Sequence, residues 1–125
     1  MMDDRAGKVV IGGEEYELLL TTLATKEIAK KYGGLDKLGD MMQSGDIIQS
    51  LDEVAWLIAT LANQPIMIAN RKNHEKRELL TAEDVELMTA PADIGNMSDA
   101  IMEAIGKGMK RNVVSEEIEK NAVGE

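Results

Sequence analysis

The most apolar part of the chain, residues 54–69, reads VAWLIATLANQPIMIA. Apolar residues occupy nearly every face of a helix from Val54 to Ala62, so we expect this helix to be the central, buried one. Pro65 lacks a backbone N–H and should kink or interrupt the helix, which then resumes from Ile66 to Asn73. The run is shorter than a membrane span and contains polar residues, so it does not predict a transmembrane helix.

A β-hairpin is predicted ahead of this helix, over about residues 8–19. Lys8–Ile11 is short and rich in β-branched residues, and Glu14–Leu18 alternates polar and apolar residues. The doublet Gly12-Gly13 between them is typical of a two-residue hairpin turn. Because an isolated hairpin is marginally stable in water, its apolar face should lie on the helices.

Two helices are expected between the hairpin and the central helix. Thr21 or Thr22 can cap the first, which should end at the glycines of residues 33–34. A short helix over residues 35–42 follows, and residues 43–46 favour a turn. The side chains expected to face the core in these two helices are Leu23, Ile28, Tyr32, Leu35, Leu38, Met41 and Met42.

Two more helices are predicted after the central one. Residues 71–77 are too polar for a core and should form a solvated helix end or a loop. Thr81–Asp84 resembles a capping box that opens a short helix, which stops near Pro91. Residues 113–125 are weakly patterned and are expected to fray. The last helix carries apolar residues at spacings of three and four, namely Ile94, Met97, Ile101, Ile105 and Met109.

Length and composition indicate a single domain, residues 1–125, with a helical body over about residues 22–112. The expected fold class is mainly α with a small N-terminal β-hairpin (α+β), in a compact bundle of about five helices. The absence of Cys excludes disulfides, thiolate catalysis and the usual zinc sites. The first residues lack the apolar region of a signal peptide, so a cytoplasmic protein is expected.

The chain is acidic, with 23 Asp and Glu against 14 Lys and Arg and a net charge of −9. Such a field repels phosphate, so nucleic acid is not an expected partner. A DNA-binding role would require the basic residues of the second half to gather on one face. These residues are Arg71, Lys72, Lys76, Arg77, Lys107, Lys110 and Arg111.

No catalytic, metal or cofactor site is expected, and the chain is not predicted to be an enzyme. The single histidine, His74, has only Glu78 at helical spacing, which makes a poor metal site. Asp52-Glu53 and Glu83-Asp84 fall at expected helix starts, where acids complement the helix dipole. Gly106-Lys107-Gly108 is compatible with phosphate binding, but close helix packing is the favoured interpretation.

Methionine is the residue type that points to a binding surface. Its flexible side chain is overused where varied apolar segments bind, although it also fills core space that Phe would fill. Met102 lies off the stripe formed by Ile101, Ile105 and Met109. The predicted contact surface combines the segment after the proline with the last helix, at Ile66, Met67, Met102 and Met109.

Six segments occur in a fixed order along the chain, and this order resembles a known family. The segments are GEEYEL (13–18), TLATKEI (22–28), YGG (32–34), WLIATLANQ (56–64), LTAEDV (80–85) and AIMEAIGKG (100–108). The chain resembles the tail assembly chaperones of long-tailed bacteriophages and prophages, in the form common in Gram-positive hosts. The resemblance covers roughly residues 9–114.

The resemblance implies a helical protein with a small N-terminal hairpin whose partner is the tape measure protein. That partner is long, helical and apolar enough to need covering before the tail tube polymerises round it. Self-association is also common in such proteins. An acidic body with Met and Leu on its surface suits the holding of an apolar helix. Another phage structural component, or a small helical adaptor between proteins, stays open as the alternative.

Overall fold

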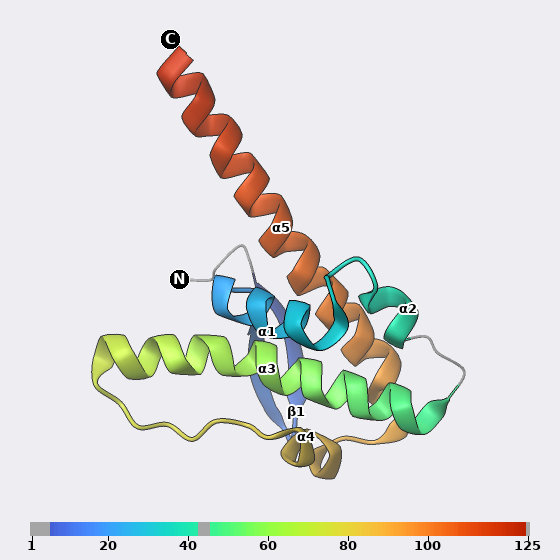
Figure 1. Cartoon of the computed structure of the whole chain (residues 1–125). Helices are drawn as coiled ribbons and strands as arrows, with labels where there is room; N and C mark the ends of the chain where they lie inside the picture. Colours follow the sequence, from blue (N-terminus) through green and yellow to red (C-terminus); the bar gives the residue numbers. More distant parts are fainter. Residues whose placement is uncertain (1–5, 43–45, 125) are drawn as a thin grey trace.

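Five α-helices and a two-stranded antiparallel sheet make up the described part of the chain in this computed structural model (Figure 1). The backbone is described for residues 6–42 and 46–124, and side chains for residues 7–42 and 46–110. Helices account for 69% of the chain, so the predicted class, mainly α with an N-terminal hairpin, is confirmed. Most of the turn predicted at residues 43–46 lies outside the described residues.

The central helix is α3, Ile47–Asn73, which packs against the other four α-helices and the second strand. Its residues from Val54 to Ala62 are mostly buried, as predicted. The helix continues through Pro65, so the predicted interruption does not occur, and the kink that was the other expectation stays a prediction. A proline inside a helix costs about 3 kcal/mol. The flanking Gln64 and Ile66 are both buried.

Helix α1, Thr22–Tyr32, is fastened to α3 at its first turn. The Thr21 hydroxyl oxygen accepts a hydrogen bond from the Ala24 N–H at 3.0 Å and donates one to the Gln64 side-chain oxygen at 2.6 Å. Gly33 ends the helix in the left-handed conformation, with φ 83°. Both predicted boundaries are confirmed, because caps are signals that a sequence shows directly.

The inward faces of α1 and of α2, Leu38–Met42, differ from the prediction at one residue. Leu23 is 48% exposed, so its predicted inward position is wrong. Ala24 takes that position, because it stands four residues before the next buried side chain on the same helix face. The other predicted residues are buried or partly buried in the core, namely Ile28, Tyr32, Leu35, Leu38, Met41 and Met42.

Strands β1, Ala6–Ile11, and β2, Glu14–Leu19, form the predicted hairpin, with Ile11 opposite Glu14 at its end. The turn residues Gly12-Gly13 have φ of 60° and 81°, which two-residue hairpin turns of this kind require and which glycine adopts without strain. β2 packs on α3, and β1 packs on the last helix. The hairpin therefore buries its apolar face on the helices, as expected.

Helix α5, Ile94–Gly124, packs along β1 and then projects away from the other elements (Figure 1). Two glycines permit this close approach. A Cβ on Gly7 would lie 2.8 Å from a carbonyl oxygen of α5, and one on Gly108 would lie 2.8 Å from the Cβ of Leu20. The packing role predicted for Gly108 is confirmed, whereas Gly106 has nothing within 4 Å and has no such role.

The inward face of α5 follows the predicted stripe except at its end. Met109 is 46% exposed, because the neighbouring Gly108 faces the body instead. Ile94 is partly buried against the core. The backbone is helical as far as Gly124, and the fraying expected of residues 113–125 stays a prediction. The buried residues of α5 are Met97, Ala100, Ile101, Ala104 and Ile105.

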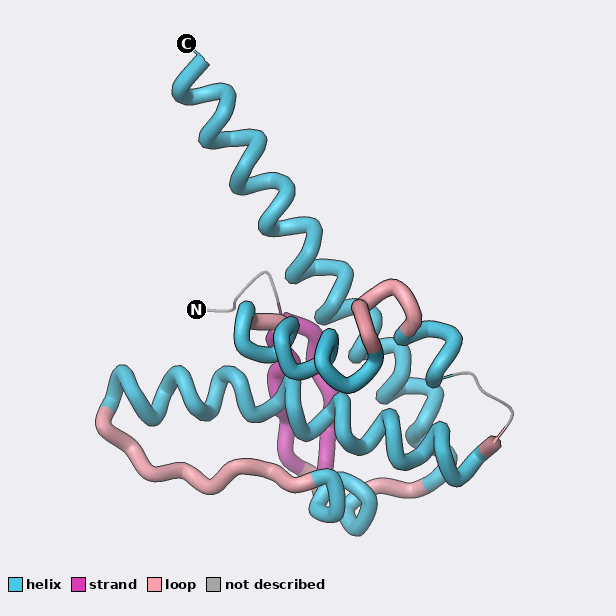
Figure 2. Tube along the Cα trace, in the orientation of Figure 1, coloured by secondary structure: helices cyan, strands magenta, loops and turns pink. Residues whose placement is uncertain are grey.

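An extended segment, residues 75–80, leads from the end of α3 to α4, Ala82–Met88 (Figure 2). The Asn63 side chain donates a hydrogen bond to the Leu80 carbonyl at 2.8 Å and accepts one from the Leu80 N–H at 2.7 Å. Asn70 makes the same pair of bonds with the backbone of Arg77, both at 3.1 Å. Two asparagine side chains of α3 therefore form hydrogen bonds with the backbone of the extended segment, as a neighbouring strand would.

Candidate functional site

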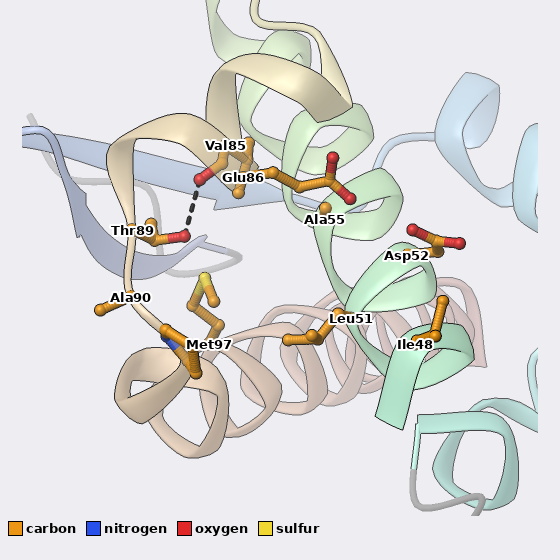
Figure 3. Close-up of a pocket in the computed structure, with 10 residues that line it drawn as sticks. Ile48, Leu51, Asp52, Ala55, Val85, Glu86, Thr89, Ala90 and Met97 are labelled. Atoms are coloured by element: carbon orange, nitrogen blue, oxygen red, sulfur yellow. Dashed lines mark hydrogen bonds between the residues drawn. The ribbon is translucent and has the colours of Figure 1, made fainter. Parts of the chain in front are cut away.

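An open, mainly apolar groove lies where α3, α4 and the start of α5 meet (Figure 3). Its volume is about 230 Å³. Sites that enclose small molecules usually measure about 300–1,000 Å³. The residues that line the groove are Ile48, Leu51, Asp52, Ala55, Val85, Glu86, Thr89, Ala90, Pro91 and Met97.

The floor of the groove is formed by side chains that belong to the core. Ala55, Val85 and Met97 expose only 3%, 1% and 4% of their surface. At the rim, Ile48 is 70% exposed. The hydroxyl of Thr89 donates a hydrogen bond to the Val85 carbonyl at 2.6 Å, the dashed line in Figure 3. Because this hydroxyl already has a hydrogen-bond partner, the wall of the groove offers a bound molecule mainly apolar contacts.

Helix α4 forms one wall of the groove, and its N-terminus is held by the predicted capping box. The Thr81 hydroxyl accepts a hydrogen bond from the Asp84 N–H at 3.0 Å, and the Asp84 carboxylate accepts one from the Thr81 N–H at 2.9 Å. The asparagine contact at Leu80 fixes the preceding residue. Two further apolar side chains of this short helix face solvent, since Leu87 is 77% exposed and Met88 is 43% exposed.

The rim of the groove is acidic. Asp52 on α3 and Glu86 on α4 both line it, and both are exposed. Residues 46–70 contain three acids and no Lys or Arg, and residues 78–106 contain seven acids and no Lys or Arg. These two stretches supply every residue that lines the groove. The electrostatic field at the groove therefore favours the binding of a positively charged molecule.

A second hollow, of about 290 Å³, lies between the hairpin and the start of α5. Its lining includes Lys8 and Glu15, whose charged groups are 3.8 Å apart, together with Asp93 and Asn96. These exposed polar groups do not form the nucleophile-and-base arrangement that catalysis needs. In the described residues, no group of three or more His, Asp or Glu side chains is placed to hold a metal ion.

A buried tyrosine marks the contact between α1 and α3. The rings of Tyr32 and Trp56 meet edge to face at 6.0 Å, and the Lys31 ammonium lies 4.9 Å from the Trp56 ring and 3.6 Å from the Glu53 carboxylate. Burial, and then the nearby Glu53 carboxylate, raises the pKa of Tyr32. Its hydroxyl has no hydrogen bond of acceptable geometry within the described residues, so the influence of Glu53 is mainly electrostatic.

None of the four residues predicted as a contact surface lines the groove. Ile66 is 4% exposed and is a core residue in this structure, and Met67 is partly buried beside it on α3. Met102 and Met109 are 43% and 46% exposed. They stand seven residues apart and therefore share one side of α5. A contact role for these four residues stays a prediction.

Sequence reasoning missed the groove, although one signal for it was present. Ile47 and Ile48 directly follow Asp46, which caps α3 by accepting hydrogen bonds from the backbone N–H groups of Ile48 and Gln49. Two large apolar side chains at a helix start belong either to the core or to an exposed apolar surface, and the sequence alone does not decide between the two. Both are in fact exposed, at 65% and 70%.

Compared with protein-family models, with curated proteins and with solved structures, the chain has no match. Among the described residues, no helix has the length and apolar character that crossing a membrane requires. Whether the basic residues at the end of α3 and on α5 gather on one face, as a DNA-binding role would need, stays untested.

Proposed function

We propose that this chain is a phage tail assembly chaperone, which binds the tape measure protein in the host cytoplasm and keeps it soluble until the tail tube forms. Two observations support the proposal. The ordered segments of the sequence resemble that family, and the fold is helical with a small N-terminal hairpin, as the resemblance implies. In this role the chain holds its partner and catalyses no reaction.

The groove between α3, α4 and α5 is the observation that carries the proposal. A protein that covers an apolar partner needs apolar surface that its own core does not fill. The groove supplies buried Val85 and Met97 at its floor and exposed Ile48 at its rim. The net charge of −9 keeps such a protein in solution while it presents this surface.

The size of the groove suits a partner that must later be released. A volume of about 230 Å³ receives only a few side chains. Binding energy in protein interfaces comes mostly from a few well-packed contacts. A groove that receives only a few side chains therefore binds its partner with modest affinity. A long partner held at several such points stays soluble and is freed when the tail tube competes for the same apolar surface.

The proposal places the gene of a long helical protein, the tape measure protein, immediately downstream, and its absence there would refute the proposal. The experiment that tests the proposal is co-expression with that protein. The soluble fraction of that protein is measured with and without this chain, and the soluble material is sized by gel filtration. We expect the partner to become soluble and to elute together with this chain. If the partner stays insoluble, the proposal fails, and the alternative of another phage structural component or helical adaptor replaces it.

A further inference from the structure

We infer that the groove binds a single amphipathic helix of the partner, and that this helix carries Lys or Arg beside its apolar stripe. The inference rests on the proposed function and names the chemistry of the segment that is bound. It concerns the groove lined by Ile48, Val85 and Met97 and the two rim carboxylates, Asp52 and Glu86.

The bound segment of the partner is helical because the groove offers few hydrogen-bonding groups to an extended backbone. An extended segment entering an apolar groove must find partners for its backbone N–H and C=O groups. The wall offers few, since the Thr89 hydroxyl already bonds the Val85 carbonyl. The two strands of the sheet lie elsewhere and line no part of it. A helix satisfies its own backbone and inserts only its apolar side chains.

The bound helix carries Lys or Arg because the rim of the groove is acidic. Asp52 and Glu86 come from two different helices, so a helix lying between them meets a carboxylate on each wall. The stretches 46–70 and 78–106 contain no Lys or Arg that would neutralise them. The second hollow, which shares Met97 with the groove, is lined by Lys8, whose ammonium lies 3.8 Å from the Glu15 carboxylate. Acidic rims of this kind select partners by charge complementarity.

The same charges argue against a second copy of this chain as the occupant. The end of α5 projects from the body, so it is the helix of a second copy that would enter the groove (Figure 1). Its residues 112–124 contain three Glu and one Lys, so they would bring further negative charge to an acidic rim. Two chains that each carry a net charge of −9 also repel one another.

The test uses two synthetic helical peptides that differ only in flanking charge. Both carry Leu at the a and d positions of three heptads, one with Lys and the other with Glu at the e and g positions. Binding to the full chain is measured by fluorescence anisotropy at low and high salt. We expect the Lys peptide to bind at least about fivefold more tightly than the Glu peptide, with the difference shrinking as salt is raised.

Two variants locate the binding. Asp52→Asn combined with Glu86→Gln should abolish most of the preference for the Lys peptide. The matched control, Asp40→Asn with Glu75→Gln, removes the same charge from exposed acids that do not line the groove and should keep the preference. Ile48→Gln should lower the affinity for the Lys peptide about tenfold, because an apolar contact is lost. Its control, Leu23→Gln, changes an exposed residue on α1 and should leave affinity unchanged.

Equal affinity for the two peptides, or equal behaviour of the rim variant and its control, would overturn the inference. The outcome separates the inference from the proposed function. If the downstream protein is kept soluble by the Ile48→Gln and rim variants as well as by the unaltered chain, the chaperone proposal stands and the groove inference fails. If the Lys peptide binds as expected but the downstream protein stays insoluble, the proposed function fails while the chemistry of the groove stands.

Discussion

Two regions of α5, one near Gly108 and one near Met97, meet the rest of the molecule in different ways. Near Gly108 the helix lies so close to the body that a Cβ would come within 2.8 Å of Leu20. Near Met97 the same helix forms the floor of an open groove whose rim residue Ile48 is 70% exposed. The first region is packed for stability, and the second leaves apolar surface free for a partner. Substitutions should therefore affect stability in one region and binding in the other.

The largest expected difference is between a leucine of the core and one beside the groove. Leu57 is fully buried on α3, so Leu57→Ala should lower the free energy of unfolding by about 2–5 kcal/mol. Leu87 is 77% exposed on α4, so Leu87→Ala should change it by no more than about 0.5 kcal/mol. Urea unfolding followed by circular dichroism measures both. Similar losses for the two variants would show that Leu87 is packed rather than exposed.

The close contact of α5 can be tested with two glycines that are two residues apart. Gly108→Ala should destabilise the protein by about 1–3 kcal/mol, because the new methyl group meets the Cβ of Leu20 and neither atom can move without the backbone. Gly106→Ala has open space and should stabilise the helix by up to about 1 kcal/mol. Thermal unfolding of the two variants should therefore shift in opposite directions. A shift in the same direction would contradict the packing.

The position of α4 depends on the asparagine contact that precedes it. Asn63→Ala removes two hydrogen bonds to the backbone of Leu80 and should cost about 1–2 kcal/mol. The Leu80 amide should then exchange its hydrogen faster, as followed by NMR. Asn70→Ala removes the equivalent bonds to Arg77 at an exposed site and should cost less. Unchanged exchange at Leu80 in the first variant would rule out this contact as the anchor of α4.

The smallest expected effect concerns Tyr32 and appears only at alkaline pH. Burial and the Glu53 carboxylate raise its pKa in the folded state, whereas the unfolded chain releases the proton near pH 10. The stability that Tyr32 contributes is therefore complete below about pH 10 and is lost as the pH rises further. Unfolding free energies measured from pH 8 to 11 should fall more steeply for the unaltered chain than for Tyr32→Phe. Parallel curves would contradict the raised pKa.

Local signals in the sequence predicted the elements of the fold. Gly12-Gly13 marks the hairpin turn, Thr21 the start of α1, and Thr81–Asp84 the capping box of α4, because each device needs only neighbouring residues. The inward side of α1 was harder to predict. Leu23 is the larger apolar residue, but the adjacent Ala24 has the spacing of four from Ile28 that places it on the buried face.

The groove could not be predicted because its residues are distant in the sequence. Ile48, Val85 and Met97 belong to three helices, and each looks like an ordinary core residue in its own segment. Only the packing of α3 against α4 and α5 brings them together and leaves Ile48 outside. Met102 and Met109 of the predicted contact surface are exposed on α5 but line no part of the groove.

The most direct measurement is co-expression of the downstream helical protein with three forms of this chain: unaltered, Ile48→Gln and Leu23→Gln. The two substitutions are matched, because each replaces an exposed apolar residue at the second position of a helix. We predict that the unaltered and Leu23→Gln forms keep the partner soluble and elute with it, while Ile48→Gln loses most of the partner to the insoluble fraction. Equal solubility with all three forms would contradict the claim that the groove holds the partner.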